Sequence, residues 1–191
     1  MTSKLVMAVS ASALALAACG QRNNETAADD ANVMVDNGIA VENEMAAAPL
    51  PTSAQGFANA AAASDRFEIE SSKLAATQAQ SAAIKSFAAK MVTAHEGSTA
   101  KLKTTVSGLI PAITPDDTLT PAQQADLDGL KAKTGADFDT AYAAAQVKAH
   151  QQAVDMLNGY ATSGDTPALK EFASGLVPTV TAHLNTAKGL K

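Results

Sequence analysis

Two segments of this 191-residue chain repeat one pattern, and the repeat restricts the fold more than any other feature of the sequence. Residues 84–88 (Ile-Lys-Ser-Phe-Ala) and 92–95 (Val-Thr-Ala-His) match residues 169–173 (Leu-Lys-Glu-Phe-Ala) and 180–183 (Val-Thr-Ala-His), with three extra residues around Pro178. A weaker match aligns residues 65–68 with 136–139. The repeat predicts two similar helical hairpins, joined by the longer segment 110–134, in a four-helix bundle with pseudo-twofold symmetry.

The spacing of apolar and small residues predicts where the helices lie. The most regular stripe alternates steps of three and four, as one face of a helix requires: Ile84, Phe87, Met91, His95, Ser98, Leu102, Thr105 and Leu109. Ser81 is expected to cap this helix, and Pro111 and Pro115 to end it. Similar patterns predict helices over about 53–78, 136–161 and 167–187, and a short helix that Thr120 caps and Gly135 interrupts.

Composition and charge agree with an all-α protein and exclude one class of partner. Aromatic residues make up 4% of the chain and Trp is absent, which favours helices packed through small side chains. The formal net charge is −5, and the segment 20–54 carries nearly all of it. The remainder is close to neutral and has no Lys/Arg cluster, so nucleic acid is not an expected partner.

The N-terminal residues have the pattern of an export signal. Lys4 precedes a short apolar stretch, and Leu16-Ala17-Ala18-Cys19 resembles the lipobox of bacterial lipoproteins. We therefore expect residues 1–18 to be a signal peptide and Cys19, the only cysteine, to be the lipidated first mature residue. Acyl chains would anchor the protein to a membrane. Gly20 in place of aspartate favours the outer membrane, with the protein facing the periplasm.

Residues 19–52 are polar and acidic, and they contain Gly38, Pro49 and Pro51 without sustained periodicity. This composition predicts a disordered tether. A short helix over residues 33–41 is the alternative. The bundle domain is expected over residues 53–191.

The pattern of the domain resembles a ferritin-like domain family of unknown function found in bacterial envelope proteins. The resemblance covers roughly residues 53–190 and rests on Glu68 with its following Ile-Glu-Ser-Ser-Lys-Leu-Ala, residues 87–91, His95, residues 138–142, Gln146-Val147, His150, Val177-Pro178 and His183. It implies an antiparallel ferritin-like four-helix bundle of two similar hairpins, with a short extra helix between them. It implies no established reaction.

A di-iron centre is not expected in this bundle. Such centres need a Glu-x-x-His motif on each of two helices, together with carboxylates from the other two. The residues three positions before the histidines are valines here: Val92, Val147 and Val180. Valine cannot bind iron, so we expect neither ferroxidase nor di-iron oxidase activity.

The three histidines nevertheless lie at related positions. Counted from the hairpin turns at about 1.5 Å per residue, Glu68, His95 and His150 lie at similar depth, and His183 lies about one turn deeper unless Pro178 shortens its path. One interpretation is a Zn or Cu site formed by three imidazoles and one carboxylate. The other is a polar core layer in which the histidines pair with Glu68, Asp139, Gln146 or the tyrosines.

The sequence offers no other chemistry. It contains no phosphate-binding loop, no Gly-x-Ser-x-Gly motif and no base besides the histidines, so catalytic residues are not predicted. We expect a non-enzymatic, lipid-anchored binding or interaction protein that needs no cofactor, with a membrane as its one predicted partner. The alternative is a metal- or small-ligand-binding bundle that uses the histidine layer.

Overall fold

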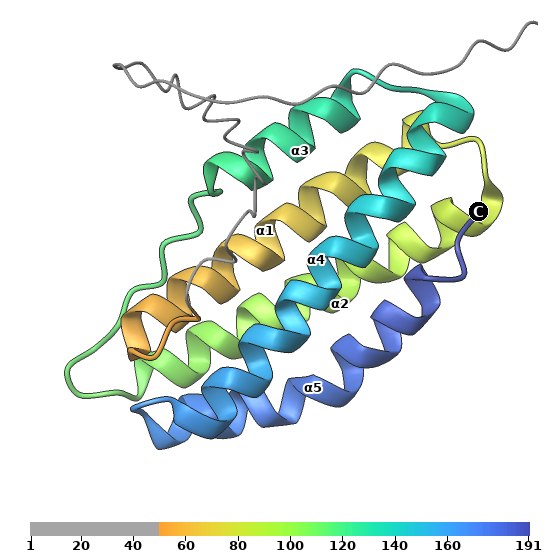
Figure 1. Cartoon of the computed structure of the whole chain (residues 1–191). Coiled ribbons are helices and arrows are strands. Elements are labelled where there is room, and N and C mark those ends of the chain that lie inside the picture. The colour runs from red at the N-terminus through yellow and green to blue at the C-terminus, as the bar shows by residue number, and fades with distance from the viewer. Residues whose placement is uncertain (1–49) are drawn as a thin grey trace, which may run out of the picture. The chain divides into compact units, whose positions relative to one another are not determined.

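The computed structural model describes residues 50–191, and the elements named in this range are five helices (Figure 1). They are α1 (Ala54–Gln78), α2 (Ala82–Ser107), α3 (Pro121–Lys131), α4 (Gly135–Ser163) and α5 (Pro167–Ala187). The predicted all-α four-helix bundle with a short extra helix is confirmed. The expected signal peptide, Cys19 and residues 19–49 of the expected tether lie outside the described residues.

Local sequence sets the helix ends. The side chain of Ser53 accepts a hydrogen bond from the Gly56 amide, and that of Ser81 accepts one from the Ile84 amide. Thr120 forms the expected capping box with Gln123. Gly135 adopts a positive φ of 62°, a conformation that glycine tolerates best, and α4 starts at this residue. The helix therefore begins one residue before the predicted start, and it continues two residues past the predicted end.

The bundle consists of two hairpins whose turns lie at opposite ends. Helix α1 packs along α2, and α4 packs along α5. Helices α1 and α4 also contact each other, as do α2 and α5. Between the hairpins, the chain runs back along the bundle through residues 108–134, and α3 packs against α1 and α4 on the way (Figure 1). One long crossover of this kind is the connection found in ferritin-like bundles.

Two apolar clusters fill the two ends of the bundle. At the end where α1 and α5 begin, Phe57 stacks on Tyr160 with ring centroids 4.0 Å apart, and Leu102 packs beside them. At the other end, Phe138 stacks on Tyr142 at 5.7 Å and Ile84 is fully buried. The residues buried between these clusters include carboxylates and imidazoles, so the middle of the bundle is polar.

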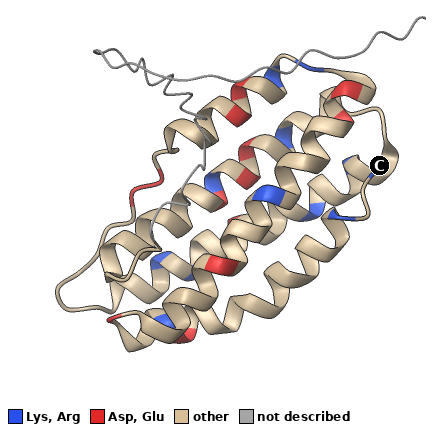
Figure 2. Ribbon diagram, viewed as in Figure 1, with Lys and Arg blue, Asp and Glu red and all other residues tan. Residues whose placement is uncertain are grey.

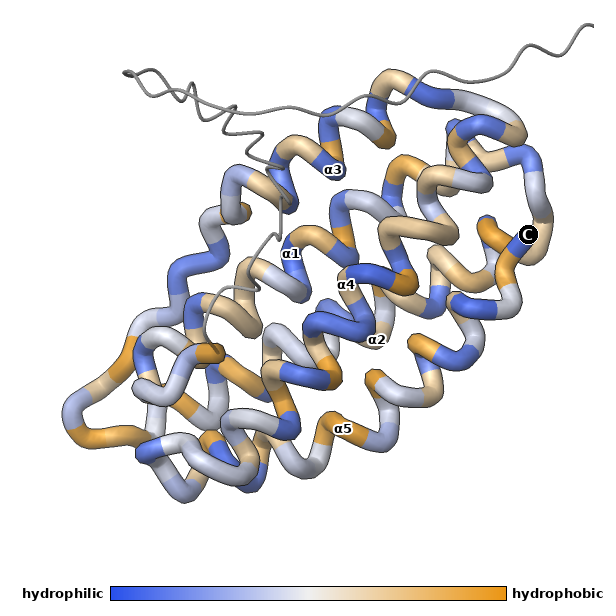
Figure 3. The backbone as a smooth tube through the Cα atoms, viewed as in Figure 1, coloured by the Kyte–Doolittle hydropathy of each residue, from blue (hydrophilic) through white to orange (hydrophobic). Residues whose placement is uncertain are grey.

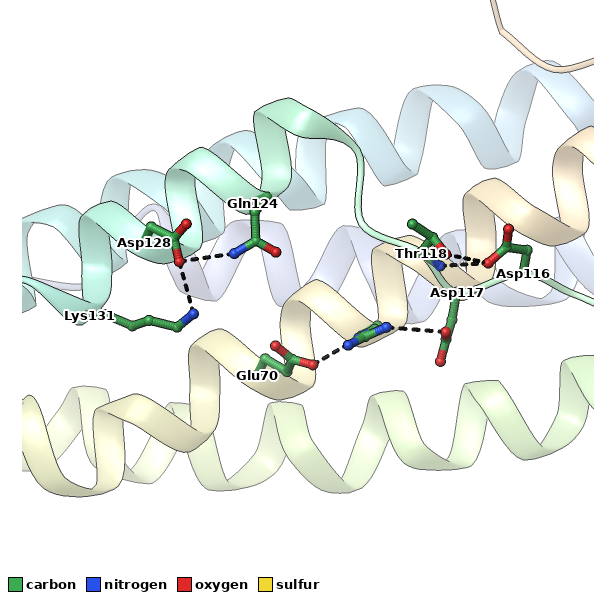
Figure 4. A network of polar contacts seen from close by, with 8 residues as sticks. Glu70, Asp116, Asp117, Thr118, Gln124, Asp128 and Lys131 are labelled. Carbon is green, nitrogen blue, oxygen red and sulfur yellow. Dashed lines mark hydrogen bonds and ion pairs between the residues drawn. The ribbon is translucent and has the colours of Figure 1, made fainter.

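The crossover is attached to α1 through polar contacts at the surface. Arg66 forms ion pairs with Glu70 at 2.8 Å and with Asp117 at 3.3 Å (Figure 4). At the C-terminal end of α1, the side-chain amide of Gln78 donates to the carbonyls of Lys131 and Lys133. These contacts hold the crossover against the outer side of α1, which leaves α1 covered on three sides.

Within residues 50–191, residues of both charges lie along the helices. Basic and acidic residues are distributed over the helices in Figure 2. The loop after α2 contains hydrophobic residues, coloured orange in Figure 3, and Ile110 within it is 99% exposed. Across residues 50–191, no helix combines the length and the apolar character that a membrane span requires.

Candidate metal centre

His95 is held by a carboxylate that the sequence analysis did not single out. Its Nδ1–H donates to Oδ1 of Asp65, on α1, over 2.8 Å, and the other oxygen of Asp65 accepts from the hydroxyl of Thr99 at 3.0 Å. Both His95 and Asp65 are buried. Because a carboxylate can only accept, this contact places the proton on Nδ1 and leaves the lone pair of His95 on Nε2.

His150 lies in the middle of α4 with a similar arrangement. Its Nδ1–H donates to the backbone carbonyl of Gln146, one turn earlier, over 2.9 Å. Oε1 of Glu68 lies 3.5 Å from the same Nδ1 atom. The ring is 1% exposed, so its lone pair, on Nε2, points into the protein interior.

His183 joins these two rings from α5. Its centroid lies 6.0 Å from that of His95 and 5.6 Å from that of His150. His183 was expected about one turn deeper than His95 and His150 unless Pro178 shortened its path; Pro178 lies inside α5, and the three rings are neighbours. The two hairpin turns lie at opposite ends of the bundle. Distances along α2 and α5 from their own first residues therefore do not share an origin.

One ring nitrogen from each histidine lies within 4.8 Å of the other two. Three buried ring nitrogens have no hydrogen-bond partner in the protein: Nε2 of His95, Nε2 of His150 and Nδ1 of His183. Two imidazole ligands of a metal at about 2.0–2.1 Å are separated by roughly 3.3–3.6 Å. Small side-chain adjustments would bring these nitrogens to that spacing, so the three histidines could bind a metal ion.

Glu68 lies beside this cluster. The group of residues whose ligand atoms lie close together contains the three histidines and not Glu68. The carboxylate of Glu68 approaches Nδ1 of His150, the nitrogen that already donates to the carbonyl of Gln146. Neither oxygen of Glu68 has a hydrogen-bond partner. Burial raises its pKa from the ordinary 4.5 to about 7.

The histidines differ in their affinity for protons. Burial lowers the pKa of His150 to about 4, and it also lowers the pKa of His183. For His95, burial acts in the same direction, but the hydrogen bond to Asp65 and the charges of Glu68 and Asp65 outweigh it and raise the pKa. Of the three histidines, His95 is therefore the one at which protons compete most strongly with a metal ion.

The other residues expected to pair with the histidines lie elsewhere. Asp139 accepts from the amides of Gln80 and Ser81 and so fixes the turn between α1 and α2. Tyr142 bonds to Ser72, and Tyr160 donates to Asp165 near the turn between α4 and α5. Asp65 takes the role expected of these residues. Its position one turn before Glu68, on the same helix, is the signal that could have identified it.

The fold and the site together define an all-α ferritin-like four-helix bundle with a cluster of three histidines, of which His95 and His150 are buried and His183 is half-buried. Residues 40–190 match the family described as "Domain of unknown function (DUF4142)", and the chain belongs to this family.

Solved structures with the same fold include "CopM in the Cu(II)-bound form", with a TM-score of 0.61 and 19% identity over 72% of this chain and 94% of that one. A "DUF305 fragment from Deinococcus radiodurans" gives a TM-score of 0.62 and 15% identity over 73% of this chain and 96% of that one. These similarities show a common fold. Among curated proteins, none matches the chain in sequence.

Proposed function

We propose that this protein is a copper-binding protein of the cell envelope, in which His95, His150 and His183 hold the ion. The observation that carries the proposal is a group of three histidines from three helices, each of which has a buried ring nitrogen without a hydrogen-bond partner. A buried polar atom normally has a partner, and three such nitrogens in one place fit a cation better than they fit a packed core.

The ligand chemistry favours copper. Imidazole suits Zn, Cu, Fe and Ni, and among divalent first-row metals copper binds nitrogen ligands most tightly. One protein with the same fold, CopM, is described in Cu(II)-, Cu(I)- and Ag-bound forms. Neither observation requires catalysis, and the proposed role is to bind the ion.

The neighbours of the histidines prepare them for this role. Asp65 and the carbonyl of Gln146 each accept from the Nδ1–H of one ring, which fixes both rings with the lone pair on Nε2. Metal-binding histidines commonly have such a second partner, because it sets the tautomer and orients the ring. If the histidines were only polar residues of the core, these buried lone pairs would have no hydrogen-bond partner.

The location is part of the proposal. Cys19 would carry the lipid anchor after removal of residues 1–18, and the bundle would then face the periplasm from the outer membrane. A Cys19→Ser variant should move from the membrane fraction to the soluble periplasmic fraction. Recovery of the wild-type protein without acyl chains would contradict the anchor and leave the metal site untouched.

Metal content tests the site. The full chain, expressed without an affinity tag, should bind about one copper ion, and the double variant His95→Ala/His150→Ala should bind none. Glu96→Gln is a matched control, because it alters the exposed carboxylate next to His95 in the sequence. Equal, substoichiometric copper in the wild type and the double variant would overturn the proposal. Selective uptake of zinc would show that the site binds zinc and not copper.

A further inference from the structure

A cavity opens beside the histidine cluster, toward the seam between α2 and α5. Its volume, counted as the space open to the centres of water-sized molecules, is about 50 Å³. Asp65, His95 and His183 form its polar end. Since one water needs roughly 10–15 Å³ by this measure, the cavity has room for a few waters or for one molecule of about two to four non-hydrogen atoms.

The other walls of the cavity are largely apolar. Met156, Phe172 and Leu176 contribute to them, while Ser98 and the exposed Thr179 line the side toward the α2–α5 seam. Ser98 has a small side chain and is half-buried, so a larger side chain at this position would fill part of the cavity. A ligand that enters here meets His95 and His183 at one end and hydrocarbon around the rest of its surface.

Three imidazoles leave the fourth position of a tetrahedral zinc ion open, and a three-coordinate Cu(I) ion can also accept a fourth ligand. Sites with three protein ligands keep a further position for water or an exogenous ligand. Glu68 is not part of the group of three histidines. Its carboxylate lies near Nδ1 of His150, which is the nitrogen that already donates a hydrogen bond. The cavity, which shares two of the three histidines, is the space into which a further position can open.

We propose that this cavity binds a small neutral molecule at the open coordination position of the ion. The inference rests on the proposed metal site and adds the class of ligand that the site admits. A neutral ligand is favoured because the walls are apolar and because the negative charge of Asp65, at the polar end, offsets the single positive charge of a Cu(I) ion, so that an anion gains no net attraction.

Carbon monoxide is a suitable probe, because it is small and neutral and binds Cu(I). The full chain, loaded with Cu(I) in the absence of oxygen, should give an infrared C–O stretching band shifted from that of free carbon monoxide. The Ser98→Leu variant, whose larger side chain fills the cavity, should keep its copper and lose the band. Thr179→Leu, which narrows the path from the exposed side, should slow the appearance of the band.

Ala100→Leu is the matched control, because Ala100 lies on the same helix as Ser98, is exposed and does not line the cavity. This variant should behave as the wild type does. A copper-loaded wild type without the band would overturn the inference and leave the proposed function standing. A band that persists in Ser98→Leu would place the ligand outside the cavity and would overturn the inference. Failure to bind copper would overturn the proposed function itself.

Discussion

The buried carboxylate of Glu68 makes the stability of the metal-free protein depend on pH. Glu68 is 1% exposed, and burial raises its pKa from 4.5 to about 7. Because the folded-state pKa lies above the unfolded one, the stabilisation from the protonated form is fully present below about pH 4.5. It is lost as the pH rises through about 7. A Glu68→Gln variant keeps the shape of the side chain and cannot ionise.

The size of the effect follows from the two pKa values. The difference between 4.5 and about 7, at about 1.4 kcal/mol per pKa unit, corresponds to about 3 kcal/mol. Between about pH 4.5 and pH 8.5, the wild type should lose this much free energy of unfolding relative to Glu68→Gln. Urea unfolding of chelator-treated protein, followed by circular dichroism at both pH values, measures the difference directly.

The control for this experiment is Glu70→Gln. Glu70 lies on the same helix, but its side chain is 38% exposed and pairs with Arg66 at the surface (Figure 4). Surface ion pairs contribute little, so the stability of this variant relative to the wild type should change by less than about 1 kcal/mol between the two pH values. If Glu68→Gln showed the same difference from the wild type at both pH values, the carboxyl group would not be desolvated, and the reasoning would fail.

Three further results are expected. Asp65→Asn should bind copper about ten- to hundredfold more weakly by competition with a chelator, because His95 loses its charged partner; unchanged affinity would mean that His95 is oriented without it. Leu102→Ala should lower the free energy of unfolding by about 2–5 kcal/mol, and the exposed Ile110→Ser by less than about 0.5 kcal/mol, as urea titrations will show. Gly135→Ala should cost about 1 kcal/mol or more, because its φ of 62° is unfavourable for alanine, and an unchanged melting temperature would contradict this.

The helices and their order follow from short-range signals in the sequence. Ser81 and Thr120 cap helices at the predicted positions, and the stripe from Ile84 marks the buried face of α2. The weaker repeat match paired α1 with α4, and each is the first helix of its hairpin, but the matched segments lie at different depths. Asp65 lies in the middle of α1, whereas the segment aligned with it, 136–139, forms the first turn of α4. A match of four residues does not fix depth, because the helices differ in length.

The sequence predicted the histidines of the site but not Asp65. The repeat placed His95 and His183 on equivalent helices, and the structure brings both together with His150. Asp65 was not predicted as a partner because a single stripe of every third or fourth residue describes one buried face. Helix α1 is covered by α2, α3 and α4, so its buried surface extends beyond that stripe and includes a carboxylate.

Asp65 and His150 occupy corresponding places in the two halves of the molecule, since each lies thirteen residues before the end of the first long helix of its hairpin. One half therefore joins an imidazole to an acid, and the other joins an imidazole to a second imidazole. At these two places, a pair of identical first hairpins would have two aspartates, and a pair of identical second hairpins would bring four imidazoles together. Only the unequal pair of hairpins within one chain combines three imidazoles with an Asp65 that bonds to one of them.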